Sequence, residues 1–417
     1  MSIILIAAGG WHGDFPGGAY KLPSDFATYL ATRGRDVAYL CPGQRVGRLN
    51  PELCNGVDVY RYPSPAASAP SVTNLVAHLR YSRAVAARIA SNGLIEALLG
   101  HSPLQYLGAL ASCRPMRKCY AAHSIFVDEW RSNHPGVQRW NVRLACAISG
   151  ILERRIYSRS DLVHCFSEYM LGELRQKYER SLRGKCAVLP AWVDTKRFTR
   201  SRETRRQVRE RLGSPWDPQA TTFLAVRRLV PRMGLDTLLE AAAILAKEEH
   251  TFKLVLAGEG PQLQPLKDRS LALSLQDRVT FLGRVPEERL VDVYRAGDCF
   301  VLPTRSLEGF GLIILEAYAC GTPVIGVPVG AIPEVFGASF HDWLARDNSP
   351  VALAERMRDF LMGRLVVDSD RLKCRASEFD FHTMAALHEH TLLEMPFDGV
   401  TAVIAPATNT IVHEPRL

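Results

Sequence analysis

The stretch with the clearest capacity for chemistry runs from Pro303 to Val335 and carries two glutamates, Glu308 and Glu316, on either side of a glycine-rich turn. An apolar run ends just before Glu308 and a helical pattern starts after Gly311, so the turn joins a strand to a helix. The free N–H groups and positive end of such a helix suit a phosphate, and a carboxylate can accept hydrogen bonds from the vicinal hydroxyls of a ribose. One glutamate lies in the turn and the other about two turns along the helix, on a similar face.

The elements that must position this stretch belong to a strand–helix alternation that restarts once along the chain. In the first half, a glycine-rich segment from Gly9 to Gly18 precedes a helix expected over 24–32, which Gly34 closes. Core strands are expected at 3–8, 37–41, 94–99, 118–122 and 162–166 in this half, and at 222–226, 252–257, 278–282, 299–303 and 323–327 in the second half. Helices are expected over 235–247 and around 316–320. Such alternation predicts α/β units with parallel sheets that helices cover on both faces.

The predicted organisation is therefore two Rossmann-like α/β domains. The first spans residues 1–195 and the second spans 196–380, followed by an amphipathic helix over 381–395 and a loose tail over 396–417. A chain of 417 residues is long enough for two such cores.

Composition indicates a soluble globular protein, with 47% hydrophobic and 23% charged residues. No apolar run approaches the roughly 20 residues that span a bilayer. The opening MSIILIAAGGW has no basic region and favours a first strand over a signal peptide. The ten cysteines form no C-x-x-C pair, which argues against zinc or redox motifs and indicates reduced thiols. We expect a cytoplasmic protein, either free or peripheral at the inner face of a membrane.

The formal charge of +8 is concentrated in one run, Lys196 to Arg211, which holds eight basic and two acidic residues. One interpretation is a solvated linker helix. The other is attraction to a polyanion or an anionic membrane surface, with which we expect at most transient contact. Nucleic-acid binding is not expected, because only Phe198 interleaves with the basic residues.

Several segments together resemble glycosyltransferase family 4, whose members have the GT-B fold and a Glu-x7-Glu motif. The 303–335 segment looks like the family's signature, and VRRLVPRMGLDTLLEAA (226–242) is similar to its phosphate-clamp strand and helix. Further matches are LAGEGP, FLGRV, SEYM and PAWVDTKRF. The resemblance implies two Rossmann-like domains facing across a cleft, with the C-terminal helix packing back on the first. It also implies a retaining transferase (a hexosyltransferase-like enzyme) that moves a sugar from a nucleotide-sugar donor to an acceptor.

The resemblance also implies roles for individual residues. Arg228 matches the arginine that grips the donor diphosphate, Glu308 the glutamate beside the transferred sugar, and Glu316 the one that holds the ribose. Backbone amides are expected to meet the diphosphate and sugar at Gly309, Phe310, Gly311 and Leu312. The nucleotide base is expected near Gly258, Glu259, Arg284 and Val285.

The first domain contributes three matching residues. Gly17 and Gly18 match a loop that approaches the donor phosphate and acceptor, and His123, in YAAHSIFVDEW, matches a histidine near the reacting sugar. Asp128 and Glu129 lie close to His123 in the sequence and could meet the acceptor, although solvated loop acids are the ordinary interpretation.

One position departs from the family pattern, because Met233 stands where the clamp usually has a lysine. Arg232 or Arg305 is expected to supply the second positive charge. Losing one cation beside a diphosphate leaving group would cost a few kcal/mol if nothing replaced it.

The expected mechanism uses no cofactor and no obligatory metal, with the nucleotide-sugar as substrate. His382, His388 and His390 are interpreted as structural and not as metal ligands, because their spacing mixes helix faces. The acceptor, whether a glycan, a lipid-linked sugar or a natural product, cannot be named from fold analogy.

Two rival functions remain. A nicotinamide-dependent oxidoreductase is disfavoured, because GGWHGDFPGG does not give a tight G-x-G-x-x-G turn. The second rival is a non-catalytic GT-B protein that binds a nucleotide or glycan and acts as a regulator. Only Met233 supports it.

Overall fold

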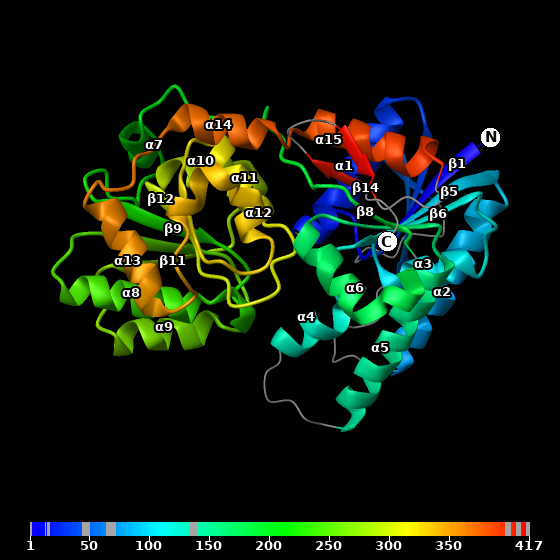
Figure 1. The fold of residues 1–417 in the computed structure, drawn as a ribbon, viewed down its shortest axis with the longest axis horizontal. Coiled ribbons are helices and arrows are strands. Elements are labelled where there is room, and N and C mark those ends of the chain that lie inside the picture. The colour runs from blue at the N-terminus through cyan, green and yellow to red at the C-terminus, as the bar shows by residue number, and fades with distance from the viewer. Residues whose placement is uncertain are drawn as a thin grey trace. The chain divides into compact units, whose positions relative to one another are not determined.

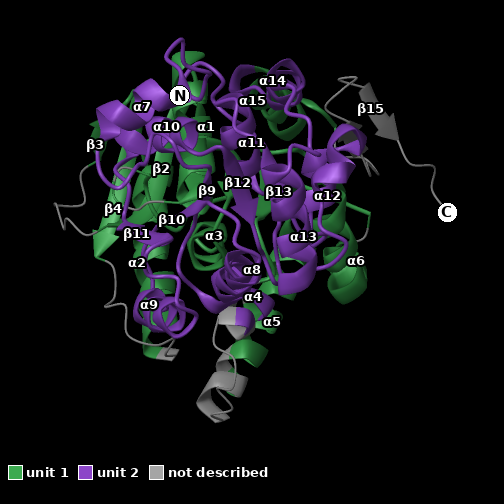
Figure 2. Cartoon of the chain, turned by 90° about the vertical axis from the view of Figure 1, so that its left-hand side faces the viewer, with its two compact units in different colours: residues 1–127, 136–191, 383–417 green, residues 128–135, 192–382 purple. Residues whose placement is uncertain are grey.

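The computed structural model describes residues 2–12, 14, 17–43, 51–63, 72–133, 140–182, 184–396, 402–405 and 410–413. Its contacts divide the chain into two units, coloured separately in Figure 2. Unit 1 comprises residues 1–127, 136–191 and 383–417, and unit 2 comprises residues 128–135 and 192–382. Among the described helices, none is long and apolar enough to cross a membrane.

The sheet of unit 1 reverses its strand order beside β1 (Ser2–Ala7). From one edge to the other its strands are β15 (Thr410–His413), β14 (Ala402–Ala405), β8 (Cys186–Val188), β7 (Leu162–Cys165), β6 (Arg117–Ala122), β5 (Leu94–Gly100), β1, β2 (Asp36–Gly43), β4 (Val57–Pro63) and β3 (Glu52–Cys54). Pairing is parallel except at the two edges, between β3 and β4 and between β14 and β15. The chain runs outward from β1 through β2 and then returns to β5 on the other side, which makes a topological switch point.

Helices cover both faces of this sheet, as the strand–helix alternation predicted (Figure 1). One face carries α1 (Gly18–Thr32) and α15 (Phe381–Glu389), which a π-helical segment extends over His390–Glu394. The other face carries α2 (Val72–Ala90), α3 (Pro103–Leu110), α5 (Trp140–Arg159) and α6 (Glu168–Leu182), while α4 (Phe126–Asn133) follows β6. Leu5, Leu98 and Tyr106 are fully buried in the core between sheet and helices. The five strands predicted for this half of the chain are confirmed.

Two predictions for unit 1 are wrong. Helix α1 begins at Gly18 and not near Ser24. Pro23 lies inside the helix, whereas the predicted range placed it just before the start. The tail is also not uniformly loose, because β14 pairs with β8 through Ala402 and Val403, and β15 pairs with β14. The sequence does contain a signal for these strands, namely the short runs of β-branched residues in 401–413.

The sheet of unit 2 is wholly parallel and has its own switch point. Its strand order is β11 (Val279–Gly283), β10 (Lys253–Ala257), β9 (Thr222–Val226), β12 (Cys299–Leu302) and β13 (Val324–Gly326). The chain proceeds from β9 to β10 and β11, then crosses back to β12 on the other side of β9. Phe223, Leu224, Phe300 and Val301 are fully buried, as expected for parallel strands covered on both faces.

The helices of unit 2 form two layers around this sheet (Figure 1). One layer contains α8 (Leu235–Lys247), α9 (Leu263–Ala272) and α13 (Pro350–Leu361), and the other contains α7 (Arg205–Leu212), α10 (Glu287–Ala296), α11 (Leu312–Ala319) and α14 (Ser369–Ser377). Shorter helical segments occur at α12 (Ile332–Phe336), Pro231–Met233 and Ala338–Trp343. The predicted strand 222–226 and helix 235–247 are confirmed with the same bounds.

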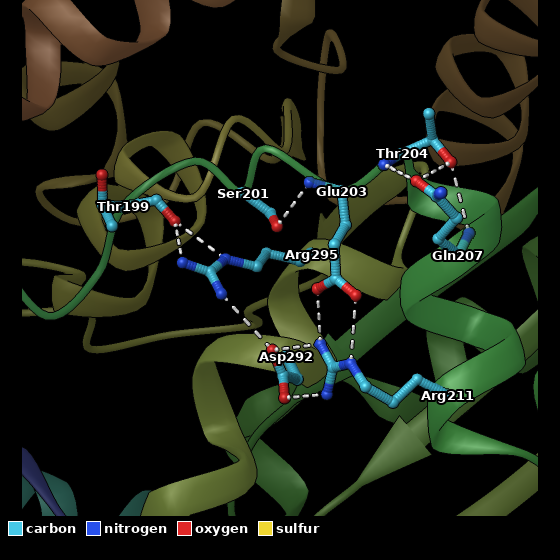
Figure 3. A network of polar contacts seen from close by, with 8 residues as sticks. All are labelled: Thr199, Ser201, Glu203, Thr204, Gln207, Arg211, Asp292 and Arg295. Carbon is cyan, nitrogen blue, oxygen red and sulfur yellow. Dashed lines mark hydrogen bonds and ion pairs between the residues drawn. The ribbon is translucent and has the colours of Figure 1, made fainter.

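Most residues of the basic run 196–211, which includes most of helix α7, are exposed, as the solvated-helix interpretation predicted, but several of its arginines also pair within unit 2. Arg211 pairs with Glu203 at 2.9 Å and with Asp292 at 2.7 Å, within the polar network of Figure 3. Arg209 is buried and bonds Asp298 at 2.5 Å. Part of the positive charge of this run is therefore balanced by acidic residues of the same unit.

Candidate functional site

The predicted residues of unit 2 gather at the carboxyl ends of two neighbouring strands. Arg227 and Arg228 follow β9, and the turn containing Glu308 follows β12, which is hydrogen-bonded to β9. These two strands flank the switch point, which is where ligands bind in open α/β sheets. Glu316 lies on α11, the helix that leaves this turn. The structure therefore brings Arg228 and Glu308 to one edge of this sheet, with Glu316 on the helix that follows.

Two arginines of this edge converge on one anionic atom. The Nη2 atoms of Arg228 and Arg232 lie 3.2 Å and 3.0 Å from the same oxygen of Glu129, a residue that the contacts group with unit 2. Arg305 instead pairs with Asp236 at 2.7 Å, toward helix α8. Because Arg232 shares an anionic partner with Arg228, it is better placed than Arg305 to supply the second positive charge.

The turn before α11 has an unusual backbone conformation. Gly311 caps the helix with a φ of +96°, and within the described residues no side chain caps this N-terminus. Leu307 has a φ of +59°, which is strained for a residue other than glycine. The ring of Phe310 packs on Phe379 at 5.7 Å between centroids, so only the main chain of Phe310 is available to a ligand.

Glu308 is held by an arginine that the sequence reasoning missed. Arg227 Nη2 donates to Glu308 Oε2 at 2.5 Å, and Arg227 Nη1 donates to the hydroxyl of Thr304. The Arg227 side chain is 4% exposed, whereas that of Arg228 is 59% exposed. The sequence does contain one signal for this contact. Arg227 and Arg228 are adjacent at the end of a strand, and because successive side chains of a strand point to opposite sides, only one of the two can face the same way as the other site residues.

Glu316 is held in a comparable way by Tyr294 of helix α10. The Tyr294 hydroxyl donates to Glu316 Oε2 at 2.7 Å, and Glu316 is 9% exposed. Burial, followed by the charge of Glu316, raises the pKa of Tyr294 well above its usual value, so this phenol remains a hydrogen-bond donor. Tyr294 could not be predicted from the sequence, because no motif or residue spacing indicates that α10 packs beside α11.

The residues expected at the nucleotide base lie in loops that follow β10 and β11: Gly258, Glu259, Arg284 and Val285. The N–H of Gly258 donates to the carbonyl of Gly283 at 2.7 Å, which brings the two loops together. Gly258 has a φ of +136°, and a Cβ there would lie 1.8 Å from the carbonyl oxygen of Arg227. Only glycine allows this close approach. The side chains of Glu259 and Arg284 are exposed.

In unit 1 the predicted residues also lie at the carboxyl edge of the sheet. Gly17 has a φ of +118° and caps α1, which begins at Gly18 and has no side-chain cap among the described residues. This loop follows β1, and His101 follows β5, so the two flank the switch point of unit 1. His123 follows β6, the next strand in the sheet.

His123 contacts a second histidine that the sequence reasoning did not consider. Its Nε2 lies 3.0 Å from Nδ1 of His101, and its ring packs on Phe166 at 4.9 Å. Burial, together with the nearby histidines, lowers the pKa of His101 well below its usual value. A neutral His101 can therefore orient the His123 ring through a single shared proton.

Trp192 and His388, one of the three histidines interpreted as structural, both have packing or hydrogen-bond contacts. Trp192 is buried and packs on Phe381 at 5.8 Å between centroids, and His388 Nε2 bonds the carbonyl of Pro190 at 3.0 Å. Within the described part of the chain, no three His, Cys, Asp or Glu side chains are grouped as metal ligands.

Comparisons with known proteins match both units. Residues 16–197 match the family model described as Glycosyltransferase Family 4, and residues 207–377 match the one described as Glycosyl transferases group 1. A GDP-mannose-dependent alpha-(1-6)-phosphatidylinositol monomannoside mannosyltransferase of Mycolicibacterium smegmatis is 31% identical over 241 residues, which are 56% of this chain. The match spans 58% of the length of that relative.

Solved structures of similar architecture cover nearly the whole chain. Sucrose-phosphate synthase from Thermosynechococcus elongatus superposes with a TM-score of 0.78 at 22% identity, covering 94% of this chain and 98% of the other. Anabaena HepE in complex with UDP-glucose superposes with a TM-score of 0.68 at 18% identity, covering 95% and 100%. These likenesses show the GT-B fold. With a family match over most of each unit, the chain belongs to glycosyltransferase family 4.

Proposed function

We propose that this protein is a retaining glycosyltransferase that moves a sugar from a nucleoside-diphosphate sugar to an acceptor. One observation carries the proposal: Arg228, Arg232, Glu308 and the N-terminus of α11 share the carboxyl edge of β9 and β12, and Glu316 follows on α11. This arrangement supplies positive charge for a diphosphate and carboxylates for sugar hydroxyls in one place. A relative named as GDP-mannose-dependent supports the same class of donor.

In the proposed reaction, the bond between C1 of the sugar and the β-phosphate oxygen breaks. A hydroxyl oxygen of the acceptor forms the new bond to C1 on the same face, and its proton passes to the departing phosphate oxygen. Arg228, Arg232 and the amides of the turn stabilise the charge that develops on that oxygen. Because the leaving group accepts the proton, the reaction needs no strong protein base. The same charges substitute for a metal ion.

The first experiment is a thermal-shift screen of the full chain against UDP, GDP, ADP and dTDP and their sugars, because ligand binding raises the unfolding temperature. The donor that stabilises most is then incubated with candidate acceptors, and nucleoside diphosphate release and the anomeric configuration of the product are measured by NMR. We expect release with retained configuration. An inverted product would reject the retaining mechanism, and binding without hydrolysis or transfer would favour a non-catalytic protein.

The metal-free mechanism has its own test. Turnover is measured with excess chelator and again after adding Mg²⁺ or Mn²⁺. We expect equal rates, because arginines and helix amides carry the charge stabilisation that a metal would provide. Loss of activity with chelator, recovered by either ion, would reject this part of the proposal.

A further inference from the structure

Arg227 and Arg228 are adjacent but have opposite environments. Arg228 is largely exposed, whereas the guanidinium of Arg227 points into unit 2 and is almost fully buried. Burying a guanidinium is unfavourable, and burial lowers the pKa of Arg227, an effect that the charge of Glu308 opposes. A buried charge of this kind is retained where it has a fixed partner.

The partners of Arg227 form a closed triangle. Its two terminal nitrogens donate to Thr304 and to Oε2 of Glu308, and the Thr304 hydroxyl lies 3.5 Å from the same Oε2. Thr304 is fully buried, so this anchor does not depend on a surface side chain. Among the described residues, no side chain bonds the other oxygen, Oε1.

The backbone at both ends of this ion pair is also fixed. Arg227 is packed under Gly258, as described above, and Glu308 is packed under Gly330, where a Cβ would lie 2.4 Å from the Glu308 carbonyl oxygen. That oxygen accepts the N–H of Ala331 at 2.9 Å. On the other side, Arg232 Nη1 donates to the carbonyl of Leu307 at 3.0 Å. The main chain is thus set, and the side-chain torsions of Glu308 are what remain to be restrained.

We propose that Arg227 is a positioning residue for sugar transfer, which holds Glu308 through Oε2 and leaves Oε1 to the sugar. The inference rests on the proposed function of Glu308 beside the transferred sugar. Without its anchor the glutamate regains rotamer freedom, which must be lost again in each catalytic cycle. Arg227 is not itself in contact with the donor, so its removal should lower turnover and leave donor binding nearly unchanged.

The test compares Arg227→Met, Arg227→Lys and Glu308→Gln in the full-length chain, with the donor identified by the thermal-shift screen. We expect Arg227→Met to lower kcat on the order of 100-fold, the effect of a small misplacement of a reacting group, while the Kd of the nucleoside diphosphate stays the same. Lysine should restore part of kcat, because it keeps the charge but lacks the fork that reaches two partners. Combining Arg227→Met with Glu308→Gln should add little to Glu308→Gln alone.

The matched control is Arg209→Met, which removes an arginine of equal burial that pairs with Asp298 at the same 2.5 Å distance. It should lower the unfolding temperature without a comparable loss of kcat. Multiplicative losses in the Arg227–Glu308 double variant, or equal losses in kcat and donor affinity, would overturn the proposal.

A measurement without donor separates this inference from the proposed function. Carbodiimide coupling of a small amine, followed by peptide mass spectrometry, reports how readily the Glu308 carboxyl reacts. It should react faster in Arg227→Met than in the wild type and Arg209→Met, and equal labelling would overturn the anchoring role. A wild type that binds no nucleoside diphosphate and releases none would reject the proposed function, whatever the labelling shows.

Discussion

Both sheets have a switch point at their carboxyl edge, but the side chains beside the two switch points differ in charge. In unit 2, guanidinium groups and carboxylates lie at the switch point, and the most buried guanidinium, that of Arg227, is paired with Glu308. In unit 1, the corresponding edge carries imidazoles and aromatic rings, with His101 behind His123. The side chains beside the two switch points therefore differ: arginines and carboxylates in unit 2, and imidazoles and aromatic rings in unit 1.

The imidazoles of unit 1 continue inward from this edge. The ring of His164 on β7 lies 6.3 Å from that of His101 and 5.5 Å from that of His388, and Phe166 packs against His164 and His388. Burial, with the neighbouring imidazoles next in size, lowers the pKa of His101 and of His164 well below the usual value. Burial also lowers the pKa of His388 to about 4. Near neutral pH this cluster is therefore uncharged, and it serves packing and orientation.

The largest effect is expected from removing the charge of Glu308, at the carboxyl edge of unit 2. Glu308→Gln keeps the shape but removes the charge, and we expect kcat to fall on the order of 100- to 1,000-fold. The exposed Glu288→Gln on α10 is the control and should keep wild-type turnover. Unfolding temperatures of both variants check that the fold survives. Wild-type turnover in Glu308→Gln would remove this residue from the reaction.

The second test lowers the pH, which protonates the buried histidines of unit 1 when the protein unfolds. His388 titrates near 6.5 when unfolded and at about 4 when folded, so the unfolded chain binds more protons between these values. Its contribution to stability is complete above pH 6.5 and is lost as pH falls toward 4, by about 3 kcal/mol. His101 and His164 act in the same direction. Urea unfolding of the full chain at several pH values should show a shallower dependence for His388→Gln and an unchanged one for the exposed His382→Gln.

The third test asks which cations of the charged edge act on the ligand. Arg228→Ala removes a group that converges with Arg232, and we expect a 10- to 100-fold loss of kcat/KM, roughly the value of one charge-assisted contact to a phosphate. Arg305→Ala should have little effect, because Arg305 pairs with Asp236. A larger loss from Arg305→Ala than from Arg228→Ala or Arg232→Ala would reverse the assignment of the second cation.

The smallest expected effect concerns the ribose. Glu316→Ala should weaken nucleoside diphosphate binding about tenfold, or about 1.4 kcal/mol, by removing one hydrogen-bonded carboxylate. A 2′-deoxy analogue should bind the wild type more weakly than the ribonucleotide, and this preference should disappear in the variant. Calorimetry measures both affinities. An unchanged preference would count against the ribose assignment, and Tyr294→Phe should give an intermediate result, because it only loosens the carboxylate.

Much of the architecture was predictable because its signals are local. Apolar runs marked the core strands of both halves, and glycines marked the turns at 258 and 311, where the backbone adopts positive φ. The predictions that failed concern weak or conflicting local signals. Pro23 lies inside α1 although the residue commonly starts a helix, and the strands β14 and β15 depend on an existing edge, β8, with which to pair.

By itself, the sequence determined the two α/β units, the glycine turn with its two glutamates, and membership of a recognisable family. Only the tertiary structure decided that Arg227 faces inward to Glu308, that Tyr294 holds Glu316, that His101 contacts His123, and that the basic run pairs internally. The reason is physical: propensity and periodicity act between residues a few positions apart. A side chain's partner 81 positions away, as for Arg227 and Glu308, is set by which strands lie side by side.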